Sequence, residues 1–133
     1  TYYSALGESD EKMLLARAIQ MFMPGKPQVW YLDLFAGRND HEAVRRAGES
    51  GHKEINRTNL STDQIAEDLK KDVVQKQLAL IRMRNTHKAF SEGAEVAISG
   101  GESSLQIRWE YNSAFATLNV NFESGTYTIV ESR

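Results

Sequence analysis

The sequence contains no cysteine and only two prolines among its 133 residues. The lack of cysteine excludes a disulfide scaffold, a thiolate zinc site and a cysteine nucleophile, and it fits a reducing compartment. No apolar run approaches the roughly 18 residues of a membrane-spanning helix. Neither a signal peptide nor a membrane partner is therefore expected, and the predicted location is cytoplasmic.

The sequence also lacks a large excess of either positive or negative charge. The 16 Lys and Arg residues face 18 Asp and Glu residues, which gives a net charge of −2. A nucleic-acid partner would require a basic patch, so none is expected. The length is typical of one domain, at about 100–200 residues each, yet the sequence begins at Thr1 rather than at Met. That start leaves three explanations open: processing, an artificial boundary, or a piece of a longer protein.

The hydrophobic pattern predicts a helix and then a strand in the first part of the chain. Residues 10–23 are apolar nearly all round, with Ser9 as the N-cap, which is typical of a helix buried on more than one side. After the Pro24-Gly25 turn, the β-rich run Gln28–Leu32 predicts a strand of a parallel sheet. The sequence offers this strand no parallel partner, so a neighbouring strand is expected to be missing.

A long polar segment, Asp33–Asn59, follows the expected strand. Loops of this length are usually functional or disordered, and Asp40–Ala47 within it predicts a short helix. Ser61 and Gln64 match a capping box, which predicts the start of another helical stretch. We expect this stretch to be interrupted over Lys70–Asp72.

After Gly93 the hydrophobic period changes from that of a helix to two. The alternation predicts an antiparallel sheet that is packed on one face and wet on the other. The expected strands are Glu95–Ile98, Leu105–Tyr111, Phe115–Phe122 and Thr126–Val130.

Sites for metals and cofactors are not indicated. His41, His52 and His87 are scattered, and none has the spacing of metal ligands, so they are interpreted as surface or capping residues. No Walker loop, dinucleotide fingerprint or nucleophile elbow occurs. We therefore predict neither a metal ion nor a cofactor.

Two residues of the polar segment are candidates for a functional site. Asp33 directly follows the expected strand, where ligands bind in barrels and doubly wound sheets, and its alternative role is to cap a loop. The planar guanidinium group of Arg57 can donate paired hydrogen bonds to carboxylates, phosphates and sugar hydroxyls. Its alternative role is an ion pair with a nearby acid, and sequence alone leaves both roles open.

Four aromatic residues lie on the expected strands: Trp30, Tyr31, Trp109 and Tyr111. They are interpreted as core residues, because each falls on an apolar strand face, although a sugar-stacking platform is the alternative.

Several blocks of the sequence resemble the closing part of the sucrose phosphorylases, a family of the α-amylase clan. The most specific are Pro24–Tyr31, which reads Pro-Gly-x-Pro-Gln-Val-x-Tyr, and Ile55-Asn56-Arg57. Further blocks are Thr1–Gly7, Ala36–Asp40 and Ile81–Phe90. The resemblance covers the whole chain.

The resemblance implies an α+β fragment. Residues 1–92 would be the last helix–strand–helix part of a (β/α)8 TIM barrel, with 33–59 as the loop above the active site. Residues 93–133 would be a C-terminal antiparallel β domain. The catalytic carboxylates of such an enzyme would lie upstream of Thr1, so no catalytic residue is assigned and the chain alone is expected to be inactive.

The resemblance also implies the reaction of the parent enzyme. Sucrose and inorganic phosphate would give glucose 1-phosphate and fructose by retaining phosphorolysis, and Arg57 matches an arginine that reaches the substrate pocket near the donor sugar and phosphate. Thr58-Asn59-Leu60, Trp30 and Asp33 depart from the common family pattern. These departures leave glucosylglycerate or sucrose phosphate as alternative substrates.

Two further hypotheses remain. One is a non-catalytic carbohydrate-binding or interaction module. The other, compatible with the enzyme fragment, is self-association into a homo-oligomer through exposed barrel surface.

Overall fold

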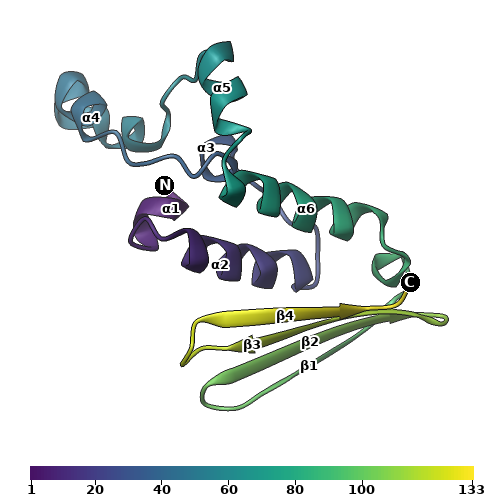
Figure 1. Ribbon diagram of the computed structural model, residues 1–133. Coiled ribbons are helices and arrows are strands. Elements are labelled where there is room, and N and C mark those ends of the chain that lie inside the picture. Colours follow the sequence, from purple (N-terminus) through teal and green to yellow (C-terminus); the bar gives the residue numbers. More distant parts are fainter. The chain divides into compact units, whose positions relative to one another are not determined.

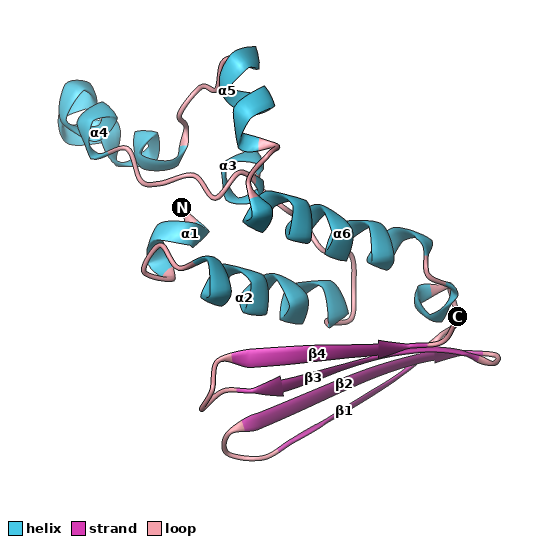
Figure 2. Cartoon of the chain, in the orientation of Figure 1, coloured by secondary structure: helices cyan, strands magenta, loops and turns pink.

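Helices fill the chain as far as Phe90, and strands follow from Glu95 onward, as Figure 2 shows. The computed structural model describes all residues from 1 to 133. None of the helices has the length and apolarity that crossing a bilayer would require. The elements are α1 (Tyr2–Ala5), α2 (Asp10–Phe22), α3 (Tyr31–Leu34), α4 (His41–Ala47), the 3-10 helix η1 (Gly48–Asn56), α5 (Thr62–Asp68), α6 (Asp72–Thr86), the 3-10 helix η2 (Lys88–Phe90), β1 (Glu95–Gly100), β2 (Ser104–Tyr111), β3 (Ala114–Asn121) and β4 (Thr126–Glu131).

The chain divides into two units, each built from two stretches of sequence. The first unit comprises residues 1–13 and 28–78, and the second comprises residues 14–27 and 79–133. Helices and a four-stranded antiparallel sheet together confirm the expected α+β class. The expected domain boundary between residues 92 and 93 stays a prediction.

Helix α2 begins and ends where its sequence signals predict. The Ser9 hydroxyl oxygen accepts a hydrogen bond from the Lys12 N–H at 3.2 Å, so Ser9 is the N-cap. Asp10 and Glu11 occupy the first turn, where the helix dipole favours carboxylates. Backbone hydrogen bonding, followed by the Ser9 hydroxyl, lowers the pKa of Glu11. The helix ends at Phe22, just before Pro24-Gly25.

The strand expected at Gln28–Leu32 is wrong. Residues 28–30 form no regular structure, and α3 begins at Tyr31. A parallel strand requires a partner for its hydrogen bonds, and every strand pair in this chain is antiparallel. Trp30 and Tyr31 are also not core residues, because they are 48% and 37% exposed, respectively.

The polar segment contains more regular structure than its composition predicts. Helix α4 is confirmed, with the Asp40 carboxylate accepting a hydrogen bond from the Ala43 N–H at 2.8 Å. The 3-10 helix η1 follows directly and has no counterpart among the sequence predictions. Farther along, the Ser61 hydroxyl accepts from the Gln64 N–H at 3.1 Å at the start of α5. The expected interruption is also confirmed, because α5 ends at Asp68 and α6 begins at Asp72.

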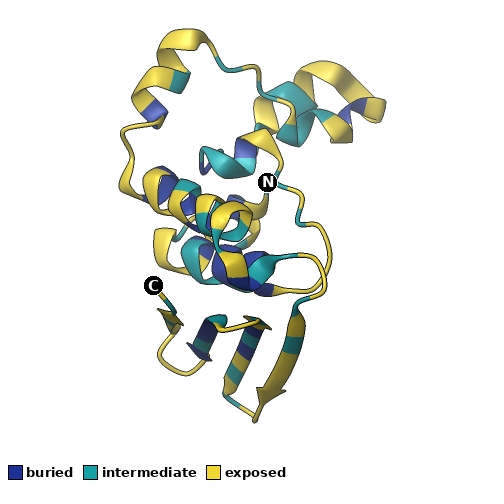
Figure 3. Ribbon diagram, turned by 90° about the vertical axis from the view of Figure 1, so that its right-hand side faces the viewer, coloured by how far each residue is buried: buried dark blue, intermediate teal, exposed yellow.

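The sheet has the order β1-β2-β3-β4, and Figure 1 shows its strands in that sequence. One row of aliphatic side chains crosses it through the directly opposed residues Ile98, Ile107, Leu118 and Ile129. Figure 3 shows the resulting bands of buried and exposed residues along the strands. Burial is deepest on the two central strands, so the packed face predicted from the alternation is confirmed.

Trp109 of β2 anchors the sheet within the second unit. Its indole N–H donates a hydrogen bond to the carbonyl of Phe22, at the end of α2, at 2.6 Å. The Arg84 guanidinium lies 4.3 Å from the Trp109 ring centroid and 4.7 Å from that of Phe90. It also donates to the Gly25 carbonyl at 2.9 Å. Burial lowers the pKa of Arg84, so this arginine takes part in the packing of the second unit.

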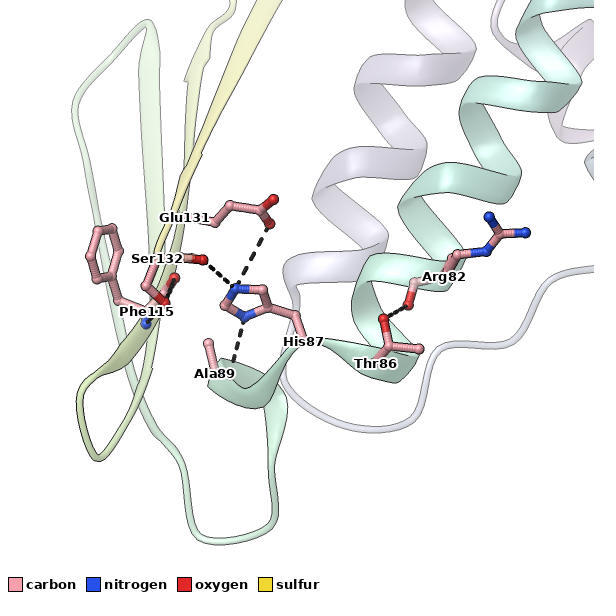
Figure 4. A network of polar contacts seen from close by, with 7 residues as sticks. All are labelled: Arg82, Thr86, His87, Ala89, Phe115, Glu131 and Ser132. Atoms are coloured by element: carbon pink, nitrogen blue, oxygen red, sulfur yellow. Dashed lines mark hydrogen bonds and ion pairs between the residues drawn. The ribbon is translucent and has the colours of Figure 1, made fainter.

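His87 caps η2 and contacts the C-terminal end of the sheet, as Figure 4 shows. Its Nδ1 accepts a hydrogen bond from the Ala89 N–H at 3.2 Å, and its Nε2 lies 3.0 Å from the Ser132 carbonyl oxygen. Since a carbonyl only accepts, the neutral ring with its proton on Nε2 satisfies both contacts. The capping role expected of this histidine is confirmed.

Two isoleucines of the sheet form a matched pair for testing its core. Ile107 and Ile98 are directly opposed, yet Ile107 is 0% and Ile98 is 51% exposed. Ile107→Ala leaves a cavity, so we expect it to lower the free energy of unfolding by about 2–5 kcal/mol. Ile98→Ala should cost less than about 1 kcal/mol. Urea unfolding followed by circular dichroism measures both, and equal losses would contradict the packing described here.

Candidate functional site

Arg57 lies just after the end of η1 and presents its side chain to solvent. The side chain is 54% exposed, and one guanidinium nitrogen lies 3.3 Å from a carboxylate oxygen of Glu54. An exposed pair of this kind contributes about 0–1 kcal/mol. The contact is the ion pair that sequence leaves open as one role of Arg57, and it is weak enough to exchange for an anionic or polyhydroxyl ligand.

Hydrogen bonds hold the backbone on both sides of Arg57. The Trp30 indole N–H donates to the Asn56 carbonyl at 3.0 Å, and the Tyr31 hydroxyl donates to the Thr58 carbonyl at 2.8 Å. Nearby, the Asp40 N–H donates to the Ile55 carbonyl at 2.9 Å. The segment that carries Arg57 is therefore fixed by donors from two other parts of the first unit.

Helix α3, which carries Tyr31, is itself anchored. Leu32 is 1% exposed. The amide of the buried Gln77 donates to the Leu34 carbonyl at 3.0 Å. An Asp33 carboxylate oxygen accepts from the Tyr2 N–H at 2.7 Å at the start of α1. Asp33 thus has the capping role that was the alternative to a ligand site, and Asp33 and Arg57 make their contacts with different partners.

A cavity of about 810 Å³ opens in the first unit, walled mainly by parts of residues 32–40 and 58–73. Its volume lies within the range of small-molecule sites, about 300–1,000 Å³. Thr58 belongs to the wall, whereas its neighbour Arg57 does not. The cavity therefore ends beside the segment that presents the candidate arginine.

Both cations of the cavity wall are paired with carboxylates. Lys71 pairs with the buried Asp68 at 2.8 Å, and Arg38 pairs with Glu8 at 2.9 Å. The wall also carries the Asp10 and Asp40 carboxylates, so acids outnumber bases on it. This excess of negative charge suits a neutral polyhydroxyl ligand better than a free anion.

The Tyr3 hydroxyl, also on the cavity wall, donates to an Asp10 carboxylate oxygen at 2.8 Å. Burial, and then this hydrogen bond, raise the pKa of Tyr3 above its ordinary value of 10.0. The hydroxyl consequently stays a neutral donor over the physiological pH range.

The remaining candidates are not brought into one site. His41 and His52 are exposed, and no group of His, Asp and Glu side chains has the arrangement of a metal site. Sequence reasoning missed the hydrogen bonds of Trp30 and Tyr31. Their polar tips are the available signal, because the donor groups of tryptophan and tyrosine usually find partners.

No protein-family model matches the chain. Individual proteins are nevertheless clearly similar to it. A sucrose 6(F)-phosphate phosphorylase from Ilumatobacter coccineus is 52% identical over 97% of this chain and 24% of its own length. A sucrose phosphorylase from Agrobacterium vitis is 43% identical over 99% of this chain and 26% of its own length. The chain therefore spans about a quarter of the length of these relatives.

Comparison of the fold with solved structures agrees with the sequence comparison. The crystal structure of a sucrose 6F-phosphate phosphorylase from Thermoanaerobacter thermosaccharolyticum matches 100% of this chain with a TM-score of 0.92 and 41% identity. The match covers 26% of that protein. By sequence and by fold, the chain is homologous to the sucrose phosphorylases over the C-terminal quarter of their length.

Proposed function

We propose that the chain is part of a retaining glucosyl phosphorylase that transfers glucose from sucrose or sucrose 6(F)-phosphate to inorganic phosphate. The observation that carries this proposal is the 52% identity to a sucrose 6(F)-phosphate phosphorylase over 97% of the chain. The matching fold over 100% of the chain supports it. Glucosylglycerate is the remaining alternative donor, because several residues near Arg57 depart from the common pattern.

The chemistry of such an enzyme requires two carboxyl groups about 5 Å apart. One attacks C1 of the glucosyl group while the other protonates the oxygen that leaves with the fructosyl group, so the C1–O bond breaks and a glucosyl ester forms. An oxygen of phosphate then attacks C1, the ester bond between C1 and the first carboxylate breaks, and the phosphate proton passes to the second carboxylate. Glucose 1-phosphate then leaves, and both carboxyl groups are restored. The proposal assigns both carboxyl groups to regions of the parent enzyme outside this chain.

In this proposal Arg57 contributes binding rather than bond cleavage. Its guanidinium is exposed and held only by Glu54, so a phosphate or a sugar hydroxyl can replace that carboxylate at little cost. The cavity beside it adds hydrogen-bonding groups, with more carboxylates than cations.

We further propose a cytoplasmic location, supported by the lack of cysteine, and self-association. The outer edges of β1 and β4 are unpaired within the sheet, and Ile98 and Val130 on these strands are exposed. Open edges with apolar side chains favour pairing between chains. We expect sedimentation velocity of the chain to detect species larger than a monomer, and a single monomer peak across concentrations would contradict this.

The proposal predicts that the full-length parent is active and that the 133-residue chain alone is not. The 133-residue chain should release no glucose 1-phosphate from either sucrose or its 6(F)-phosphate, because it lacks the proposed carboxyl pair. The full-length parent should release it from at least one of them in a coupled assay. Turnover by the chain alone, or by the parent on glucosylglycerate only, would contradict the proposal.

Arg57→Ala in the full-length parent should lower kcat/KM by about 10- to 100-fold, the loss expected for charge-assisted hydrogen bonds. Arg45→Ala is the matched control. Arg45 is also exposed and also pairs with a glutamate three residues before it, Glu42, at 3.0 Å, yet it has no proposed ligand. Steady-state kinetics should leave the control unchanged, and equal losses in both variants would refute a binding role for Arg57.

A further inference from the structure

Trp30 and Tyr31 are neighbours in sequence whose donor groups reach the same distant segment. The Trp30 indole bonds to the Asn56 carbonyl and the Tyr31 hydroxyl to the Thr58 carbonyl, 26 and 27 residues along the chain. The single residue between these two carbonyls is Arg57. We call these two hydrogen bonds the aromatic clamp.

The local backbone explains how adjacent side chains serve the same segment. In an extended strand, consecutive side chains point to opposite faces. Here Trp30 is extended, with φ −71° and ψ 140°, and helix α3 begins at Tyr31. The change of conformation between them lets both rings approach the segment, with centroids 4.9 Å apart and planes tilted by 51°. The absence of the expected strand is thus what makes the clamp possible.

The clamp is connected to a rigid base. Leu32 is buried, and the Leu34 carbonyl accepts from Gln77, so α3 is fixed in the first unit. On the other side, the Arg57 N–H donates to the Glu54 carbonyl at 3.3 Å. The backbone before and after Arg57 is therefore held, while its side chain remains 54% exposed.

We propose that Trp30 and Tyr31 are positioning residues that hold the Arg57 guanidinium in place for the sugar and phosphate groups of the parent enzyme. This inference rests on the proposed function. An exposed arginine gains binding energy from a ligand only to the extent that its backbone is already ordered, because ordering on binding consumes part of that energy. The clamp supplies this order from two sides without occupying the guanidinium.

If the clamp only stabilised the fold, loss of either donor would lower the unfolding midpoint. The positioning role predicts otherwise. Both clamp bonds are exposed to solvent, so water can satisfy the two carbonyls when a donor is removed. Loss of either donor should therefore change the unfolding midpoint little, whereas the position of Arg57 should become less defined. The unfolding midpoint therefore tests the structural role, and the catalytic activity tests the positioning role.

The test uses Tyr31→Phe in the full-length parent, which removes the hydroxyl and keeps the ring. Because the Arg57 segment is then less ordered before the ligand binds, kcat/KM for phosphorolysis should fall about 2- to 10-fold, while the unfolding midpoint changes little. Trp30→Phe, which removes the other donor, should act in the same direction. Tyr111→Phe, in the sheet of the second unit, is the matched control and should leave kcat/KM unchanged.

A double-mutant cycle separates positioning of Arg57 from any other effect. In the Arg57→Ala background, Tyr31→Phe should cause no further loss. Additive losses, or an unchanged kcat/KM in the single variant, would overturn the positioning role while leaving the proposed function intact. A parent enzyme that phosphorolyses none of the candidate donors would overturn the proposed function instead, so the two failures are distinguishable.

Discussion

Backbone carbonyls at the ends of helices and in loops must find donors, and in this chain long side chains supply several of them. Every polar group of a folded backbone needs a partner or water. Trp109 donates a hydrogen bond to the Phe22 carbonyl, Arg84 donates to the Gly25 carbonyl, and Gln77 donates to the Leu34 carbonyl. The aromatic clamp does the same beside Arg57. Each bond ties an element end or a loop to a distant element, so these donors determine where the irregular segments lie.

The donors in the second unit are held by apolar packing as well. Arg84 is the clearest case, because one of its guanidinium nitrogens, Nη1, is buried without a hydrogen-bond acceptor. Such a group is costly to bury, but the ring faces of Trp109 and Phe90 lie within 5 Å of the guanidinium carbon. Attraction between the cation and the rings offsets part of that cost. A charge near the end of α6 thereby becomes part of the unit's packing.

Local patterns predicted the parts of the fold that are stabilised locally. The caps at Ser9 and Ser61 and the period of two after Gly93 each depend on residues a few positions apart, and the corresponding elements are confirmed. The run Gln28–Leu32 was misjudged because a buried parallel strand is defined by neighbours, which a short apolar run does not reveal. The clamp left no local pattern either, since its partners are 26 and 27 residues apart. Arg57 was singled out by its guanidinium chemistry and then by resemblance, and its ion pair with a nearby acid was foreseen, whereas the two donors that hold its backbone were not.

The geometry around Arg57 combines a fixed backbone with a replaceable partner. In the proposed reaction, phosphate binds and then leaves as a sugar ester, so a binding arginine should have a second partner of modest strength. Glu54, three residues away on the same segment and 42% exposed, is such a partner. Exchange between its carboxylate and a ligand oxygen trades one charge-assisted contact for another. Because the clamp binds carbonyls and not the guanidinium, this exchange can proceed while the segment stays in place.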